Sequence, residues 1–200
     1  MESIDDLDFS KTYTYADYYS WKFEERLELI KGKIFKMSPA PGNNHQRINV
    51  NLVRLFANFL LEKPCEVFSA PFDVRLMRDE KSDRKVTTVV QPDVCVICDP
   101  GKLVDQRGCL GAPDLVIEIL SPGNSKKELE IKYDLYEEFS VKEYWVVYPT
   151  EQSIIRYVLN EFGKFKVEGK ALTGGNKIIT PILPGLELAL DDVFRGLSNN

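Results

Sequence analysis

Apolar side chains along this chain follow two spacings, one typical of helices and the other of strands. Within 45–62 the apolar residues stand three and four positions apart, so they share one helical face, and Pro64 terminates the helix. The same spacing predicts a second helix over 126–139, which Ser125 and Glu128 begin as a capping box. Two helices of useful length are therefore expected.

Strand signals occupy most of the remaining chain. Thr14 is the expected N-cap of a short helix, and 27–37 holds two apolar runs about a Lys31-Gly32 turn, which predicts a hairpin. Short runs rich in Val and Ile predict further strands, and a turn with a short helix is expected near the C-terminus. The strands are predicted at 66–77, 88–97, 113–120, 144–149, 154–159 and 164–169, and the turn and helix at 183–194.

The order of these elements favours an α/β fold in which a mixed sheet is flanked by helices. The chain has 200 residues, of which 44% are hydrophobic, and this is enough for one core of ordinary depth. It contains no internal repeat, low-complexity tract or linker. We therefore expect a single domain over 1–200.

Composition narrows the class of partner. The acidic N-terminal segment lacks the layout of a signal peptide, and no apolar run approaches the ~18 residues of a membrane span, so we expect a cytoplasmic protein without membrane contact. The formal net charge of −5 argues against indiscriminate binding of nucleic acid. Basic residues in 75–85 and 126–132 could form a local basic face, although an ordinary solvated face is the favoured interpretation of the first group.

Four cysteines raise the question of zinc. Cys95 and Cys98 have metal-ligand spacing, but an offset of three along a strand points two side chains to opposite faces. We therefore predict that this pair binds no metal. Together with Cys65 and Cys109, these residues are expected to be small buried hydrophobes in a reducing compartment.

Two predicted strands contain a carboxylate among apolar neighbours. Asp93 interrupts 88–97 and Glu118 interrupts 113–120, and a buried carboxylate requires a partner or a metal to offset its desolvation. Asp93 could instead be a turn residue at a strand end, and Glu118 could form a buried ion pair with a Lys or Arg. Pro92, which cannot donate to a ladder, favours an edge or bulge beside Asp93.

Strand register would bring these two carboxylates together. If the strands form an antiparallel pair with Ile97 opposite Asp114, then Asp93 lies opposite Glu118, with Cβ atoms about 4.5–5.5 Å apart. Both could then reach one ion of the size of Mg²⁺. Asp114 lies about 13 Å from Glu118 along the strand, which is too far to share that ion.

Groups of residues in a distinctive order extend over nearly the whole chain. They are Glu28 with Gly32, His45, Gln91-Pro92-Asp93, the run APDLVIEILSP at 112–122, Lys132 with Tyr136, EYW at 143–145 and LPGL at 183–186. This set resembles the putative restriction endonuclease family, whose members have a PD-(D/E)xK nuclease core.

The resemblance implies roles for four residues. Asp93 carries the Asp of the PD motif, Glu118 the acidic residue of (D/E)xK, and Glu28 an N-terminal acidic position near the same site. Leu120 stands where the nuclease pattern has its lysine, and Lys132 matches the relocated lysine of this family. The implied protein is an endonuclease that cuts DNA with Mg²⁺ or Mn²⁺, and a homodimer would let it meet both strands. The alternative is a catalytically inactive module that keeps the nuclease fold to bind nucleic acid or a protein.

Three polar residues on helices remain to be assigned. Lys132 shares a helical stripe with apolar residues, which predicts that it points to the carboxylates, although it could also snorkel to water. His45, in the first turn of its helix, could orient a water or a phosphate, or serve as a cap or structural residue. Tyr136, four positions beyond Lys132, could contact substrate or pack in the helix stripe.

Overall fold

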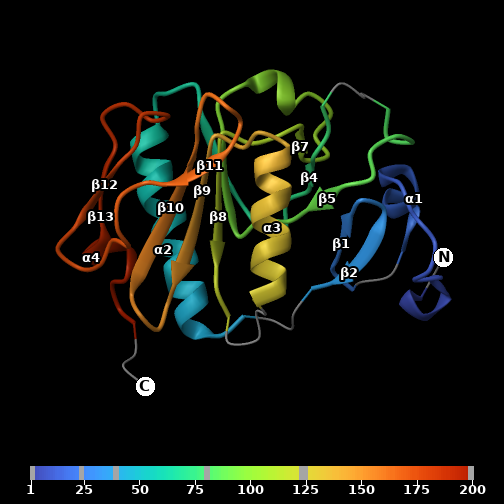
Figure 1. The fold of residues 1–200 in the computed structure, drawn as a ribbon, viewed down its shortest axis with the longest axis horizontal. Helices are drawn as coiled ribbons and strands as arrows, with labels where there is room; N and C mark the ends of the chain where they lie inside the picture. Colours follow the sequence, from blue (N-terminus) through green and yellow to red (C-terminus); the bar gives the residue numbers. More distant parts are fainter. Residues whose placement is uncertain (1–2, 23–24, 38–40, 79–81, 122–125, 198–200) are drawn as a thin grey trace.

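The computed structural model describes residues 3–22, 25–37, 41–78, 82–121 and 126–197 (Figure 1). The predicted α/β class is correct, since mixed sheets are flanked by helices. A six-stranded sheet has the order β11-β10-β9-β8-β6-β3, and a five-stranded sheet has the order β2-β1-β5-β4-β7. In the six-stranded sheet β8 and β9 run parallel, and the remaining neighbours are antiparallel.

The two long helices cover opposite faces of the six-stranded sheet (Figure 1). Side chains of alternate residues in a strand point to opposite faces, so each strand supplies both layers. Val94 and Val96 of one strand pack toward α2, while Cys95 and Ile97 pack toward α3. The strands of this sheet are β3 (Glu66–Ser69), β6 (Val94–Ile97), β8 (Leu115–Ile119), β9 (Glu143–Tyr148), β10 (Ser153–Leu159) and β11 (Phe165–Val167), and the helices are α2 (Asn43–Leu60) and α3 (Lys126–Glu138).

The five-stranded sheet lies beside the short N-terminal helix α1 (Tyr15–Ser20) (Figure 1). Thr14 caps α1 with a capping box, as predicted, and Lys31 and Gly32 both have positive φ in the predicted hairpin turn. The strands of this sheet are β1 (Leu27–Ile30), β2 (Lys33–Lys36), β4 (Val74–Arg75), β5 (Val89–Val90) and β7 (Cys109–Leu110). The C-terminal segment adds β12 (Lys177–Ile179), β13 (Glu187–Ala189) and α4 (Leu190–Val193).

Two predicted strands were wrong, because each divides between the two sheets. The segment 66–77 forms β3 and β4, and 88–97 forms β5 and β6. Pro71 and Pro92 stand at the two crossings, and because proline has no N–H it cannot continue a ladder. The remaining predicted elements are present, whereas the short strands β7, β12 and β13 were not predicted. The predicted cap at Ser125 lies outside the described residues.

The cysteine prediction was correct in one respect and wrong in another. Cys95 packs on the α3 side of the sheet and Cys98 on the α2 side, so the two point to opposite faces. Cys95 and Cys109 are buried free thiols, but Cys65 and Cys98 form a disulfide with a Cα–Cα distance of 3.9 Å. Cys65 follows the end of α2, and sequence spacing alone could not place it beside the end of β6.

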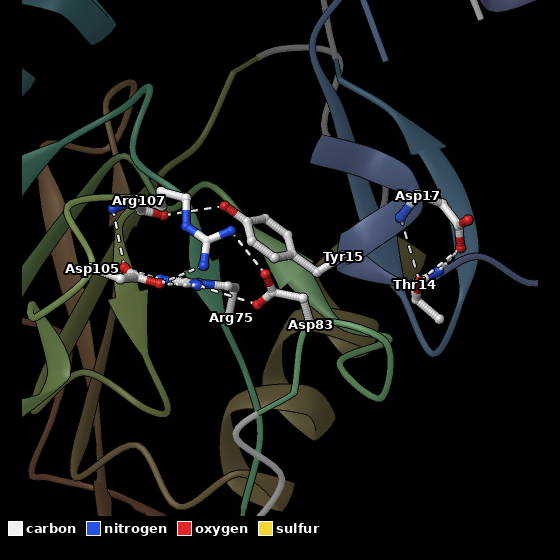
Figure 2. Close-up of polar contacts among 7 residues, drawn as sticks. All are labelled: Thr14, Tyr15, Asp17, Arg75, Asp83, Asp105 and Arg107. Carbon is white, nitrogen blue, oxygen red and sulfur yellow. Dashed lines mark hydrogen bonds and ion pairs between the residues drawn. The ribbon is translucent and has the colours of Figure 1, made fainter. Parts of the chain in front are cut away.

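An ionic cluster around the buried Arg75 connects α1 to the five-stranded sheet (Figure 2). The fully buried guanidinium of Arg75 donates to both oxygens of Asp105 at 2.6 Å, and this pairing holds the pKa of Asp105 well below its usual range. Arg107 bridges Asp105 and Asp83, and the ring of Tyr15 lies 4.8 Å from the Arg75 guanidinium. The cluster therefore fixes the N-terminal part of the chain against β4.

No helix within the described ranges combines the length and the apolar character that a membrane span needs.

Gly108 allows the loop of this cluster to reach β4, which yields a test of the fold. Its φ is +97°, and a Cβ at this position would stand 2.0 Å from the carbonyl oxygen of Asp73. We expect Gly108→Ala to lower the free energy of unfolding by about 2–4 kcal/mol in urea titrations. Gly163 has φ +70° and no atom within 4 Å of the place a Cβ would take, so Gly163→Ala is the matched control and should cost only about 1 kcal/mol. Equal losses would contradict the close approach.

Candidate active site

The register of β6 and β8 places the two candidate carboxylates side by side. Val94 pairs with Ile117 in antiparallel fashion, so the next positions along the two chains are Asp93 and Glu118. This is the register predicted from the sequence. Asp93 directly precedes β6, and Glu118 alternates with Ile117 and Ile119, which pack toward α2, so Glu118 lies on the face that α3 covers.

Asp93 is held by two groups from different elements. Its Oδ2 atom accepts a hydrogen bond from the backbone N–H of Ile119 at 2.8 Å and lies 3.2 Å from Nε2 of His45. Gly42 is the N-cap of α2, so His45 is not the cap; it is a buried neighbour of Asp93. Within the described ranges, the hydrogen bonds and ion pairs of the Asp93 carboxylate all use Oδ2.

Glu118 is held through a single oxygen by two residues one turn apart on α3. Its Oε1 atom accepts a hydrogen bond from the hydroxyl of Tyr136 at 2.6 Å and lies 3.3 Å from Nζ of Lys132. Tyr136 is fully buried, which agrees with the packing alternative, and its hydroxyl is occupied by Glu118. The contacts that described residues make to this carboxylate leave Oε2 unused.

Lys132 also contacts the third candidate carboxylate. Its ammonium donates to Oε1 of Glu28 at 2.6 Å, and the same oxygen accepts the backbone N–H of Gln91 at 2.8 Å. The Lys132 side chain is only 16% exposed, so the structure places its charged end between two carboxylates, and the snorkelling alternative is wrong. Glu28, on β1 of the five-stranded sheet, is thereby joined to α3 and to Glu118 on the six-stranded sheet.

Burial and charge set the protonation behaviour of this group. Burial, together with the nearby Asp93 and Glu28 carboxylates, raises the pKa of Glu118 to about 7, although Lys132 acts in the opposite direction. Burial alone would lower the pKa of Lys132, but Glu118 and Glu28 outweigh it and raise that pKa above its usual range. Burial followed by the charge of Glu118 raises the pKa of Tyr136 well above its usual value, so Tyr136 is a neutral donor.

The carboxylates line a cavity of about 150 Å³ between the β1–β2 hairpin, the β6–β8 strand ends and α3. His45, Gln91 and Lys132 contribute to its wall, and so does Leu120, the residue at the usual lysine position. Asp114 lies elsewhere, as predicted. It accepts hydrogen bonds from Cys98 N–H and from Lys142, and it is a buried structural residue.

The donor set fits one hard divalent cation. Asp93 and Glu118 are adjacent, and each has one carboxylate oxygen outside the contacts described above. Among the described residues no group of three or more His, Cys, Asp or Glu side chains is arranged to hold a metal. Mg²⁺ is commonly bound by one or two carboxylates with waters and substrate phosphates as its other ligands, so a two-carboxylate set is sufficient.

Sequence reasoning assigned no role to two residues that the structure adds to this site. Arg26 lines the cavity, and its guanidinium donates to the side-chain oxygen of Gln91. A signal for Arg26 was present, because it stands two positions before Glu28 and a strand turns such residues to the same face. The contacts of Gln91 depend on the crossing between sheets, which no local pattern indicates.

The chain is similar to known proteins both in sequence family and in fold. The model of the Uma2 family, described as putative restriction endonuclease, matches residues 15–191. The crystal structure of a putative nuclease from Anabaena variabilis is similar, with a TM-score of 0.70 and 19% sequence identity over 91% of this chain and 97% of that chain. Among curated proteins, none matches.

The raised pKa of Glu118 predicts how stability without metal depends on pH. A carboxyl whose pKa rises from 4.5 to about 7 on folding stabilises the fold fully below pH 4.5, and this contribution is lost as pH rises through 7. We expect the unfolding free energy in EDTA to fall by about 2–3 kcal/mol over this interval, and Glu118→Gln to remove most of the fall. Glu130→Gln, which alters an exposed carboxylate on α3, is the control. A Glu118→Gln slope equal to that of the unaltered protein would contradict the assignment.

Proposed function

This chain belongs to the putative restriction endonuclease family, and from that premise we propose that it is a metal-dependent endonuclease that hydrolyses phosphodiester bonds in DNA. The family and the nuclease-like fold support nuclease function in general. DNA as the substrate and Mg²⁺ or Mn²⁺ as the cofactor are the finer parts of this proposal. Residues 1–200 would act as one cytoplasmic domain, and a homodimer would present two such sites to a duplex.

One observation carries the proposal. Three carboxylates and a lysine from separate elements converge on one cavity, and the lysine ammonium lies within 3.3 Å of Glu28 and Glu118 oxygens. A set of buried charges opposes folding unless its members are paired, and hydrophobic residues of similar size would serve stability as well or better. Perturbed pKa values in a cleft are typical of catalytic groups. The arrangement therefore favours chemistry over a purely structural role.

Each residue has a distinct task in this proposal. Asp93 and Glu118 would hold the cation through their unused oxygens, and Glu28 could join through a water. When bound, such an ion polarises a phosphate and lowers the pKa of a coordinated water. Lys132 keeps Glu118 oriented and supplies positive charge for the negative charge that develops on the phosphate. Tyr136 and His45 would orient Glu118 and Asp93 rather than contact the substrate.

Hard oxygen donors select the class of ion. Carboxylates suit Mg²⁺ and Mn²⁺, whereas zinc sites typically include sulfur or nitrogen ligands. His45 is the one histidine of the chain, and its Nε2 atom is directed to Asp93. This supports Mg²⁺ or Mn²⁺ as the cofactor.

Replacing a carboxylate should remove both metal binding and cleavage. We expect Glu118→Ala and Asp93→Asn to abolish the heat of Mn²⁺ binding in calorimetry and to abolish Mg²⁺-dependent nicking of supercoiled plasmid, because two carboxylates provide the protein ligands. Asp114→Asn tests a buried carboxylate outside the cavity and should retain Mn²⁺ binding in the folded fraction. Metal binding without cleavage by the unaltered protein on plasmid, linear duplex and single strands would favour the inactive binding module.

Replacing the lysine should separate catalysis from metal binding. We expect Lys132→Ala to lower Mg²⁺-dependent cleavage by about 10²-fold or more, as removal of a charge-stabilising group typically does. Mn²⁺ affinity should remain close to that of the unaltered protein, since Lys132 is not a ligand. Lys126→Ala is the matched control, because that side chain is 92% exposed on the same helix. Unchanged cleavage by Lys132→Ala would exclude Lys132 from the catalytic role.

A further inference from the structure

Arg26 occupies a position at the cavity that the roles above do not explain. It directly precedes β1, is exposed to solvent and lines the cavity with Glu28. Residues two apart in a strand point to one face and stand about 7 Å apart, so Arg26 neighbours Glu28 on the same side of the hairpin. Arg26 and Glu28 therefore line the same cavity from positions one strand step apart.

The guanidinium of Arg26 is fixed by a neutral group. Its Nε and Nη2 atoms donate to Oε1 of Gln91 at 3.1 and 2.8 Å. An exposed arginine ordinarily samples many rotamers, and ordering it costs entropy that a bound ligand would otherwise have to supply. Gln91 therefore preorganises a cation at the edge of the cavity.

Gln91 is itself oriented by residues beneath it. The residue is only 8% exposed, and its amide Nε2 donates to Asp73 at 2.9 Å and to the Tyr18 hydroxyl at 3.2 Å. An ionised carboxylate can only accept hydrogen bonds, so Asp73 selects the nitrogen end of the amide and leaves the oxygen end for Arg26. Five hydrogen bonds, including that from its backbone to Glu28, hold Gln91.

The charge of Arg26 is available to a ligand. Among the described residues, no carboxylate oxygen lies within 4.0 Å of its guanidinium. Arginine has five N–H donors, and the contacts with Gln91 use only two nitrogen atoms, which leaves donors free in the planar arrangement that suits a phosphate. Lys36 also lines the cavity, but its ammonium lies over the ring of Phe9 and no hydrogen bond orients it in the described part of the chain.

We propose that Arg26, held by Gln91, binds a phosphate of the nucleic-acid strand adjacent to the phosphate that lies at Asp93 and Glu118. The inference rests on the proposed function, because it assumes a phosphodiester substrate at that site. A substrate crossing this acidic cavity requires a cation beside it, and Arg26 supplies one at a fixed position.

The salt dependence of binding tests this contact independently of cleavage. Fluorescent oligonucleotides, single-stranded and duplex, are titrated with the full chain in Ca²⁺ at several NaCl concentrations. The slope of log K against log salt is negative, and loss of one phosphate contact reduces its magnitude by about 0.7 for single strands and about 0.9 for duplex. We expect Arg26→Gln to show that decrease. Arg54→Gln, which removes an exposed arginine from α2 outside the cavity, should leave the slope unchanged.

Neutralising individual phosphates identifies the partner of Arg26. With oligonucleotides carrying one methylphosphonate at successive positions, the unaltered protein should lose affinity about 10-fold at one position that Arg26→Gln no longer senses. Arg26→Gln with an unchanged slope and an unchanged methylphosphonate profile overturns the inference.

If Asp93→Asn abolishes cleavage in that case, the proposed endonuclease function is retained and only the Arg26 contact is rejected. If the unaltered protein binds oligonucleotides but does not cleave them, the endonuclease proposal fails. The salt dependence of Arg26→Gln then still shows whether Arg26 contacts a phosphate. If it binds no oligonucleotide, both fail.

Discussion

The ammonium of Lys132 between Glu28 and Glu118 is the interaction on which the arrangement of this site depends. Each carboxylate comes from a different sheet, and the lysine comes from the helix that covers the six-stranded sheet. Without the lysine, two buried negative charges would face each other across the cavity, and desolvation would favour their neutral forms. The lysine therefore does more than supply a charge for chemistry. It also joins α3 to β1 and β8 through its two ion pairs.

The segment 91–93, where the chain crosses from one sheet to the other, positions the other groups of the site. Gln91 holds Glu28 with its backbone and Arg26 with its side chain, while Asp93 begins the strand that pairs with β8. Pro92 prevents a continuous ladder here, so the chain leaves one sheet and enters the other within three residues. Groups from both sheets consequently meet at a point that neither sheet could form alone. The cluster around Arg75 joins α1 to β4 (Figure 2).

Two other buried carboxylates show that an acidic residue in an apolar strand need not be catalytic. Glu143 is completely buried at the start of β9, yet it accepts hydrogen bonds from Trp145 and Thr180 and takes no part in the cavity. Asp114 is likewise buried and satisfied by a backbone N–H and a lysine. An acidic residue in an apolar strand therefore indicates that a partner exists, but it does not reveal whether that partner is structural. Asp93 and Glu118 differ from these residues because strand register opposes them to each other.

The sequence by itself determined most of the elements, the pairing of β6 with β8 and the juxtaposition of Asp93 with Glu118. These follow from periodicities of two and 3.6 residues, which act over a few positions and are visible in the order of side chains. It also placed Lys132 on the inner face of its helix, because the stripe of that helix is local. Only the tertiary structure decided which oxygen each group contacts, that Glu28 shares the lysine, that Gln91 holds Arg26 and that Cys65 meets Cys98. Those contacts join residues far apart in the sequence. They depend on which strands pair and on how the two sheets are placed relative to each other, and packing of the whole chain sets both rather than any local pattern.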